Sequence, residues 1–121
     1  MVLLEGTLKT KDELLDILSK NPGIIVLKLG AEWCGPCKRI EPLVNKFFDM
    51  DINNCYCIKI DVDESINLFA MYKRFRVLNG VPGLLCYTQE QDDIFPEIVC
   101  NSGDTKEVEK FFEDCLSFLQ N

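Results

Sequence analysis

The fold is decided by the stretch Ala31-Glu32-Trp33-Cys34-Gly35-Pro36-Cys37-Lys38, which follows an apolar run at 24–29 and precedes a segment with helical periodicity. This order predicts a strand, a turn and a helix. Cys34 then lies at the mouth of the turn and Cys37 one helical turn further along. Two thiols at this spacing can close a small disulfide ring and reopen it. Gly35 allows a tight bend, and Pro36 fits a first helical turn, where its missing N–H would have had no partner.

The position of these thiols predicts their chemistry. At a helix N-terminus, unpaired amide groups and the positive end of the helix dipole stabilise a thiolate. Thiol–disulfide exchange needs an exposed thiolate that attacks a disulfide and a second thiol that resolves the mixed disulfide. We therefore predict that Cys34 is an exposed nucleophile and Cys37 the resolving thiol. In such motifs the first thiol has a pKa of about 7 or lower, so Cys34 needs no histidine, and the chain contains none.

Length and charge restrict the remaining possibilities. A chain of 121 residues has the size of one domain, and we expect a single domain over residues 1–121. The net charge is −7 with scattered Lys and Arg residues, which argues against binding to nucleic acid or an anionic membrane. We find neither a signal-like start nor an apolar run of about 18 residues. We expect a cytoplasmic monomer without membrane contact.

The other five cysteines allow several interpretations. An odd total of seven cysteines argues against a fully paired disulfide framework. We expect five of them to be small buried core residues, although a regulatory or dimer-forming thiol among them stays open. These are Cys55, Cys57, Cys86, Cys100 and Cys115. Cys34, Cys37, Cys55 and Cys57 also have a spacing near that of zinc ribbons. Pro36 and the alternating pattern around Cys57 place the two pairs on separate elements, so we expect no metal.

Periodicity and turn signals predict nine elements. Strands are expected at 2–6, 24–29, 55–61, 84–88 and 94–100, the last at a sheet edge because Pro96 cannot donate to a ladder. Helices are expected from Lys11 after a Thr10–Glu13 capping box, after the cysteine pair with a kink at Pro42, and near 66–72 behind a cap at Asp63 or Ser65. A last helix is expected after a turn at 101–104, with an apolar stripe between 108 and 119. This order predicts an α/β domain with a mixed four- to five-stranded sheet and about four helices on both faces.

These residues resemble the thioredoxin family. The motif at 31–38 matches the active site of that family, Pro42 its kinking proline, Lys59-Ile60-Asp61-Val62-Asp63 its third strand, and Val81-Pro82 its cis-proline pair. The resemblance covers roughly residues 8–119 and implies a thioredoxin fold. It also implies that Val81 pairs with the substrate backbone, and that Trp33, Gly35, Pro36 and Pro82 form the substrate-binding surface around Cys34.

The sequence departs from the family pattern at three places. Lys28 replaces the buried carboxylate that the family uses for the proton of the resolving thiol, and Gly30 replaces a frequent aromatic residue. The segment before Pro82 is one residue longer, and Gly83 replaces a usual threonine. Our hypothesis is that Lys28, with Lys59 nearby, lowers the pKa of the resolving thiol. The alternative is that the Lys28 ammonium turns to solvent, Asp61 or Glu32.

The sequence predicts a thiol–disulfide oxidoreductase that reduces protein disulfides through Cys34 and Cys37 without a bound cofactor. By resemblance, a thioredoxin reductase that uses a flavin and NADPH would recycle it. Two alternatives stay open: an interaction module with the same fold but no turnover, and a more oxidising protein that forms or isomerises disulfides.

Overall fold

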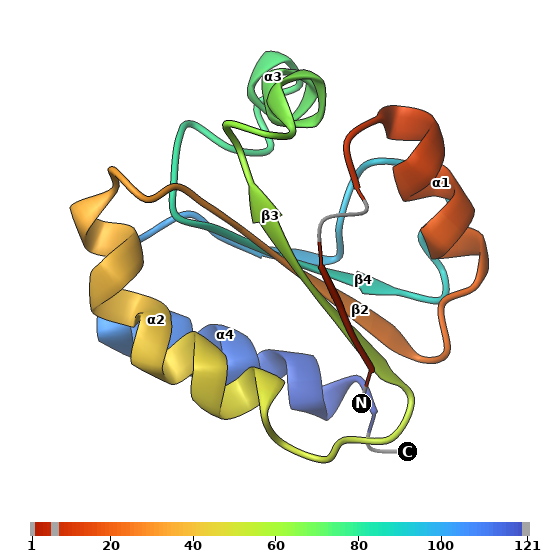
Figure 1. The fold of residues 1–121 in the computed structure, drawn as a ribbon. Coiled ribbons are helices and arrows are strands. Elements are labelled where there is room, and N and C mark those ends of the chain that lie inside the picture. The colour runs from red at the N-terminus through yellow and green to blue at the C-terminus, as the bar shows by residue number, and fades with distance from the viewer. Residues whose placement is uncertain (1, 6–7, 120–121) are drawn as a thin grey trace.

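The computed structural model describes residues 2–5 and 8–119, and their backbone forms a five-stranded sheet with two helices on each face (Figure 1). Gly6, which the sequence assigned to the first strand, lies outside the described residues. The elements run in the order β1 (Val2–Glu5), α1 (Lys11–Ser19), β2 (Ile24–Gly30), α2 (Gly35–Phe48), β3 (Cys55–Asp61), α3 (Ile66–Arg74), β4 (Gly83–Thr88), β5 (Ile98–Cys100) and α4 (Thr105–Ser117).

The strand order β1-β3-β2-β4-β5 makes the sheet mixed. β1, β3 and β2 are parallel, whereas β4 and β5 run antiparallel to their neighbours. β2 lies in the middle, which explains its continuous apolar sequence, because a central strand is covered on both faces. In β2 only Lys28 is not fully buried. The predicted α/β fold with a mixed sheet is confirmed.

The helices lie in two layers. Figure 1 shows α1 and α3 on one face of the sheet and α2 and α4 on the other. Each face has its own apolar core: one is built around Leu14, Leu68 and Tyr72, the other around Val44, Phe47 and Phe112. Alternate residues of β2 enter opposite cores, so Leu27 and Leu29 face α1 and α3 while Lys28 and Gly30 point toward α2.

Two local predictions were wrong. Ser65 is the residue before α3, but its hydroxyl donates to the carbonyl of Leu8 (2.7 Å) instead of capping the helix. The last strand begins at Ile98 and not at residue 94. The preceding segment turns on the Asp93 carboxylate, which accepts from the Phe95 amide at 2.9 Å. Pro96 has no N–H to offer a ladder, so pairing with β4 starts only behind it.

The start of α1 agrees with its sequence signal. The Thr10 hydroxyl accepts from the Glu13 amide at 3.1 Å and caps α1. Asp104 caps α4 by accepting from the Lys106 amide at 2.8 Å. Within the described parts of the chain, no helix is both long and apolar enough to cross a membrane.

Candidate active site

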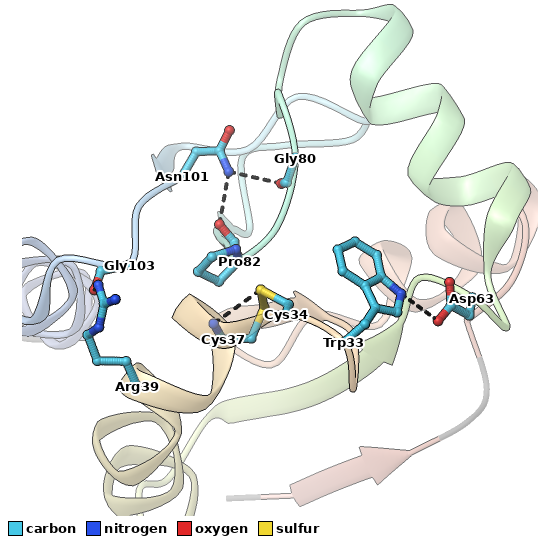
Figure 2. The surroundings of a disulfide bond; sticks show 9 residues. All are labelled: Trp33, Cys34, Cys37, Arg39, Asp63, Gly80, Pro82, Asn101 and Gly103. Carbon is cyan, nitrogen blue, oxygen red and sulfur yellow. Dashed lines mark hydrogen bonds between the residues drawn. A yellow bond between two sulfur atoms is a disulfide. The ribbon is translucent and has the colours of Figure 1, made fainter.

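The two cysteines of the motif lie where β2 gives way to α2, and they form a disulfide. Cys34 is the N-cap of α2, and its Sγ accepts a hydrogen bond from the Cys37 amide at 3.2 Å (Figure 2). The two Cα atoms are 5.3 Å apart, within the usual range for a disulfide. An amide that donates to Cys34 Sγ at a helix N-terminus also stabilises a thiolate there once the disulfide is opened.

The expectation of an exposed nucleophile is not met in this oxidised state. Cys34 is only 4% exposed and Cys37 3%. The two sulfurs are bonded to each other, and Cys37 lies in the first turn of α2. The residues around them are open: Trp33 is 67% exposed, and Gly35 and Pro36 are also exposed. A partner must therefore settle on this rim to reach Cys34 Sγ.

Trp33 is held in place beside the disulfide although it is exposed. Its indole Nε1–H donates to the Asp63 carboxylate at 2.9 Å. Asp63 follows β3, so this bond joins the loop before α2 to the loop before α3 (Figure 2). The ring is thus presented as a fixed apolar surface at the rim.

The Val81–Pro82 peptide bond is cis and lies in the loop before β4. Figure 2 shows Pro82 facing the disulfide. Asn101 holds this loop from the end of β5. Its Nδ2 donates to the carbonyls of Gly80 (3.0 Å) and Pro82 (2.9 Å), and its Oδ1 accepts from the Asn79 amide (2.7 Å).

Sequence reasoning missed Asn101. Its partners lie 19 to 22 residues earlier in the chain, and an Asn beside Ser102 and Gly103 is also typical of an ordinary turn. The longer segment before Pro82 was the one available signal for such a residue. An added residue brings a backbone N–H and C=O that need hydrogen-bond partners, which a side chain from elsewhere can supply. Gly103 was missed as well. A Cβ atom there would lie 2.7 Å from the Cβ of Pro36, so only glycine allows this close approach to the first turn of α2.

A cavity of about 700 Å³ lies behind Cys37, between β2, β3 and the start of α2. Its lining carries equal numbers of cationic and acidic side chains: Lys9, Lys28, Lys38, Lys59, Glu32, Glu41, Asp61 and Glu64. Lys28 reaches into it, and burial lowers its pKa, against attraction from Glu41 and Asp61. A Cβ atom at Gly30 would lie 3.0 Å from Lys28 Nζ and 3.5 Å from Cys37 Sγ. The ammonium group and the resolving sulfur therefore border the same small space.

Lys59 lines the same cavity but is directed elsewhere. It lies opposite Lys28 in the β2–β3 register, yet its ammonium donates to Asn45 Oδ1 at 2.7 Å and lies 5.9 Å from the Phe48 ring centroid. Asn45 is two helical turns beyond Cys37 on α2. Of the two lysines predicted to tune the resolving thiol, Lys28 is the one placed to do so, and the role of Lys59 stays a prediction.

The other five cysteines are buried and lie outside the disulfide. All five belong to the core that α2 and α4 cover, and the Sγ atoms of Cys55 and Cys57 lie 3.8 Å apart there. Burial raises the pKa of the Cys115 thiol, and a hydrogen bond with Cys55 together with burial raises that of Cys57. Among the residues that the structure describes, no group of three or more acidic, His or Cys side chains has metal-binding geometry.

Comparison with known proteins agrees with this geometry. The family model for thioredoxin matches residues 6–113. Thioredoxin from Acidithiobacillus ferridurans is 32% identical over 72 residues, which are 60% of this chain and 62% of that protein. Thioredoxin M2 from Arabidopsis thaliana chloroplasts is 29% identical over 96 residues, 78% of this chain and 50% of that protein. The matched regions thus span about half to two thirds of these two relatives.

Solved structures show the same fold over nearly the whole chain. Thioredoxin f from spinach chloroplast superposes with a TM-score of 0.70 at 17% identity, covering 98% of this chain and 95% of that one. Thioredoxin from Schistosoma mansoni gives a TM-score of 0.68 at 22% identity, covering 94% and 98%. With the family model matching most of its length, this chain belongs to the thioredoxin family.

Proposed function

We propose that this protein reduces disulfides in other proteins through the Cys34–Cys37 pair. The observation that carries the proposal is the position of Cys34 as N-cap of α2, disulfide-bonded to a cysteine one turn along the same helix. Membership in a family of thiol–disulfide oxidoreductases supports the general chemistry, and the reductase direction is the proposed part.

The reaction has two exchanges. In the reduced protein, the Cys34 thiolate attacks one sulfur of a substrate disulfide, and the other substrate sulfur leaves as a thiolate. The Cys37 thiol then loses its proton, and its thiolate attacks Cys34 Sγ. The bond between Cys34 and the substrate breaks, the substrate leaves with both sulfurs reduced, and the Cys34–Cys37 disulfide remains. Two electrons have passed from the pair to the substrate.

Protein substrates are proposed to dock on the rim formed by Trp33, Gly35, Pro36 and the Val81–Pro82 loop. Trp33 offers an apolar surface of fixed orientation, because Asp63 holds its indole. The backbone of Val81 is proposed to pair with an extended substrate segment next to its disulfide. The burial of Cys34 supports docking on the rim, because a substrate reaches a buried sulfur only if it also contacts the residues around it.

The same proposal covers the protein's cellular setting. Reducing equivalents would come from a thioredoxin reductase that carries a flavin and uses NADPH, with no cofactor bound to this chain. We propose a cytoplasmic monomer that acts on protein disulfides and binds neither nucleic acid nor membranes.

Turnover of a model disulfide protein in the presence of dithiothreitol tests the proposal. We expect each molecule of this protein to reduce many molecules of the substrate. We also expect the Cys34–Cys37 pair to have a reduction potential near the value of about −270 mV typical of thioredoxin. A potential close to about −120 mV, as in strong oxidants, would favour a disulfide-forming protein. Absence of turnover with both thiols free would favour an interaction module.

A further inference from the structure

Two departures from the family pattern meet behind the resolving cysteine. Lys28 and Gly30 are neighbours on the same side of β2, and both face Cys37 at the start of α2. We propose that Lys28 and Gly30 act as one unit: the missing side chain of Gly30 lets the Lys28 amine exchange a proton with Cys37. This inference rests on the proposed function and adds the group that handles the proton of the second exchange.

Gly30 provides the space. The position of its absent Cβ is 3.0 Å from Lys28 Nζ and 3.5 Å from Cys37 Sγ, closer than most Cβ contacts on the lysine side and an ordinary contact on the sulfur side. The aromatic residue frequent in the family at this place would occupy that space and push the amine away. A lysine at 28 and a glycine at 30 therefore depend on each other.

The charges around Lys28 fit an amine that can gain and lose a proton. It faces Glu41 on α2 and Asp61 on β3, which attract its ammonium form, and Lys59 on β3, which repels it. The β4 residue opposite it, Leu84, carries no charge. Other charged groups border the same cavity, namely Lys9, Glu32, Lys38 and Glu64. Burial is the largest influence on Lys28 and lowers its pKa, which makes the neutral amine more accessible than in a solvent-exposed lysine.

The mixed disulfide is resolved by a proton transfer followed by a thiol–disulfide exchange. The Cys37 thiol gives its proton to the Lys28 amine, which yields a thiolate and an ammonium ion. The thiolate electron pair attacks Cys34 Sγ in the mixed disulfide, and the substrate sulfur leaves with the bonding pair. The ammonium ion next to Cys37 favours its thiolate, so the second exchange begins at a lower pH than it would without Lys28. A carboxylate that accepts the proton becomes neutral, so it leaves no positive charge to attract the thiolate.

Stopped-flow reaction of the reduced protein with dithionitrobenzoate separates the two exchanges, because each releases one coloured aromatic thiolate. The first release reports attack by Cys34, and the second reports resolution by Cys37. In Lys28→Met, we expect the pH midpoint of the second release to rise by about one unit, the low end for loss of a neighbouring opposite charge. Below the midpoint this slows the second release about tenfold, while the first release keeps its rate.

Three further variants make the result specific. Gly30→Ala is expected to shift the second release in the same direction but less, because the far end of a lysine side chain can move aside. Adding Gly30→Ala to Lys28→Met should then change nothing more. Lys20→Met removes the same charge from an exposed position on α1 and should leave both releases unchanged.

The outcomes that overturn the inference are distinct from those that overturn the proposed function. An unchanged second midpoint in Lys28→Met, or an equal shift in Lys20→Met, removes the proton role of Lys28. A further shift from Gly30→Ala in the Lys28→Met background shows that Gly30 acts on Cys37 directly and uncouples the two residues. Failure of the first release in the unmodified protein instead contradicts the role of Cys34.

Discussion

The two sides of the disulfide follow different rules. On the rim, Trp33, Pro36 and the cis Val81–Pro82 pair keep the residues that the thioredoxin resemblance led us to expect. Behind Cys37, a lysine and a glycine replace the family's carboxylate and aromatic residue. In the proposed function the rim receives other proteins, whereas the space behind Cys37 handles one proton. If both proposals hold, the difference teaches that the docking surface and the proton-handling group can vary independently around one pair of sulfurs.

The largest effects should come from the sulfurs themselves. Cys34→Ser is expected to abolish turnover of a disulfide protein and to leave no covalent complex, because the attacking group is gone. Cys37→Ser should also stop turnover, but it should accumulate a mixed disulfide with the substrate at Cys34. Mass spectrometry of the reaction mixtures checks both outcomes. A mixed disulfide on Cys37 in the Cys34→Ser variant would show that the two roles are reversed.

A smaller effect is expected from a variant that disturbs the rim and leaves the space behind Cys37 unchanged. Asn101→Asp keeps the oxygen that accepts from the Asn79 amide but turns a carboxylate oxygen toward the carbonyls of Gly80 and Pro82. Each lost hydrogen bond is worth about 0.5–1.5 kcal/mol, and the loop before β4 should lose its fixed position. We expect KM for a protein disulfide to rise about three- to tenfold, while both releases from dithionitrobenzoate stay unchanged.

A matched variant exists at the other end of the molecule. Asn21 donates from Nδ2 to the Tyr87 carbonyl at 3.1 Å and accepts from the Gly23 amide at 2.9 Å. It precedes β2, whereas the disulfide follows that strand. Asn21→Asp should lower the midpoint of thermal unfolding without raising KM. A rise in KM as large as that of Asn101→Asp would show that general loosening, and not the Pro82 loop, controls substrate binding.

The comparison also shows what sequence can and cannot predict. The buried run of β2, the cap at Thr10 and the motif with Cys34 are local patterns, and the structure has them where the sequence places them. Ser65 was misjudged because a hydroxyl has two local options, and the Leu8 carbonyl becomes its partner only after the chain has folded.

The less predictable features of the site depend on distant segments. The hydrogen bonds of Asn101 cross to the Pro82 loop, and the burial of Cys34 is a property of the folded chain. Lys28 and Gly30 were each recognised as unusual. That both residues lie next to Cys37 Sγ could not be predicted, because it depends on which face of β2 they share and also on where α2 packs.

The smallest expected effect concerns folding, and it tests the environment of Lys28 without any redox chemistry. Burial lowers the Lys28 pKa in the folded, oxidised protein from its ordinary value of 10.5. Unfolding restores the ordinary value, so the unfolded chain binds more protons between the two pKa values. The free energy of unfolding of the unmodified protein should therefore rise, relative to Lys28→Met, as the pH increases from below the folded pKa to above 10.5.

This difference should not change with pH below the folded pKa, because Lys28 is protonated there in both the folded and the unfolded chain. It should be small, because Lys28 is only partly buried and solvent screens its charge. Denaturant titrations of the two oxidised proteins at a series of alkaline pH values measure it, and other titrating groups cancel in the comparison. A difference that falls with rising pH would mean that Glu41 and Asp61 outweigh burial, so that Lys28 stays an ammonium ion and can only attract the Cys37 thiolate, not accept its proton.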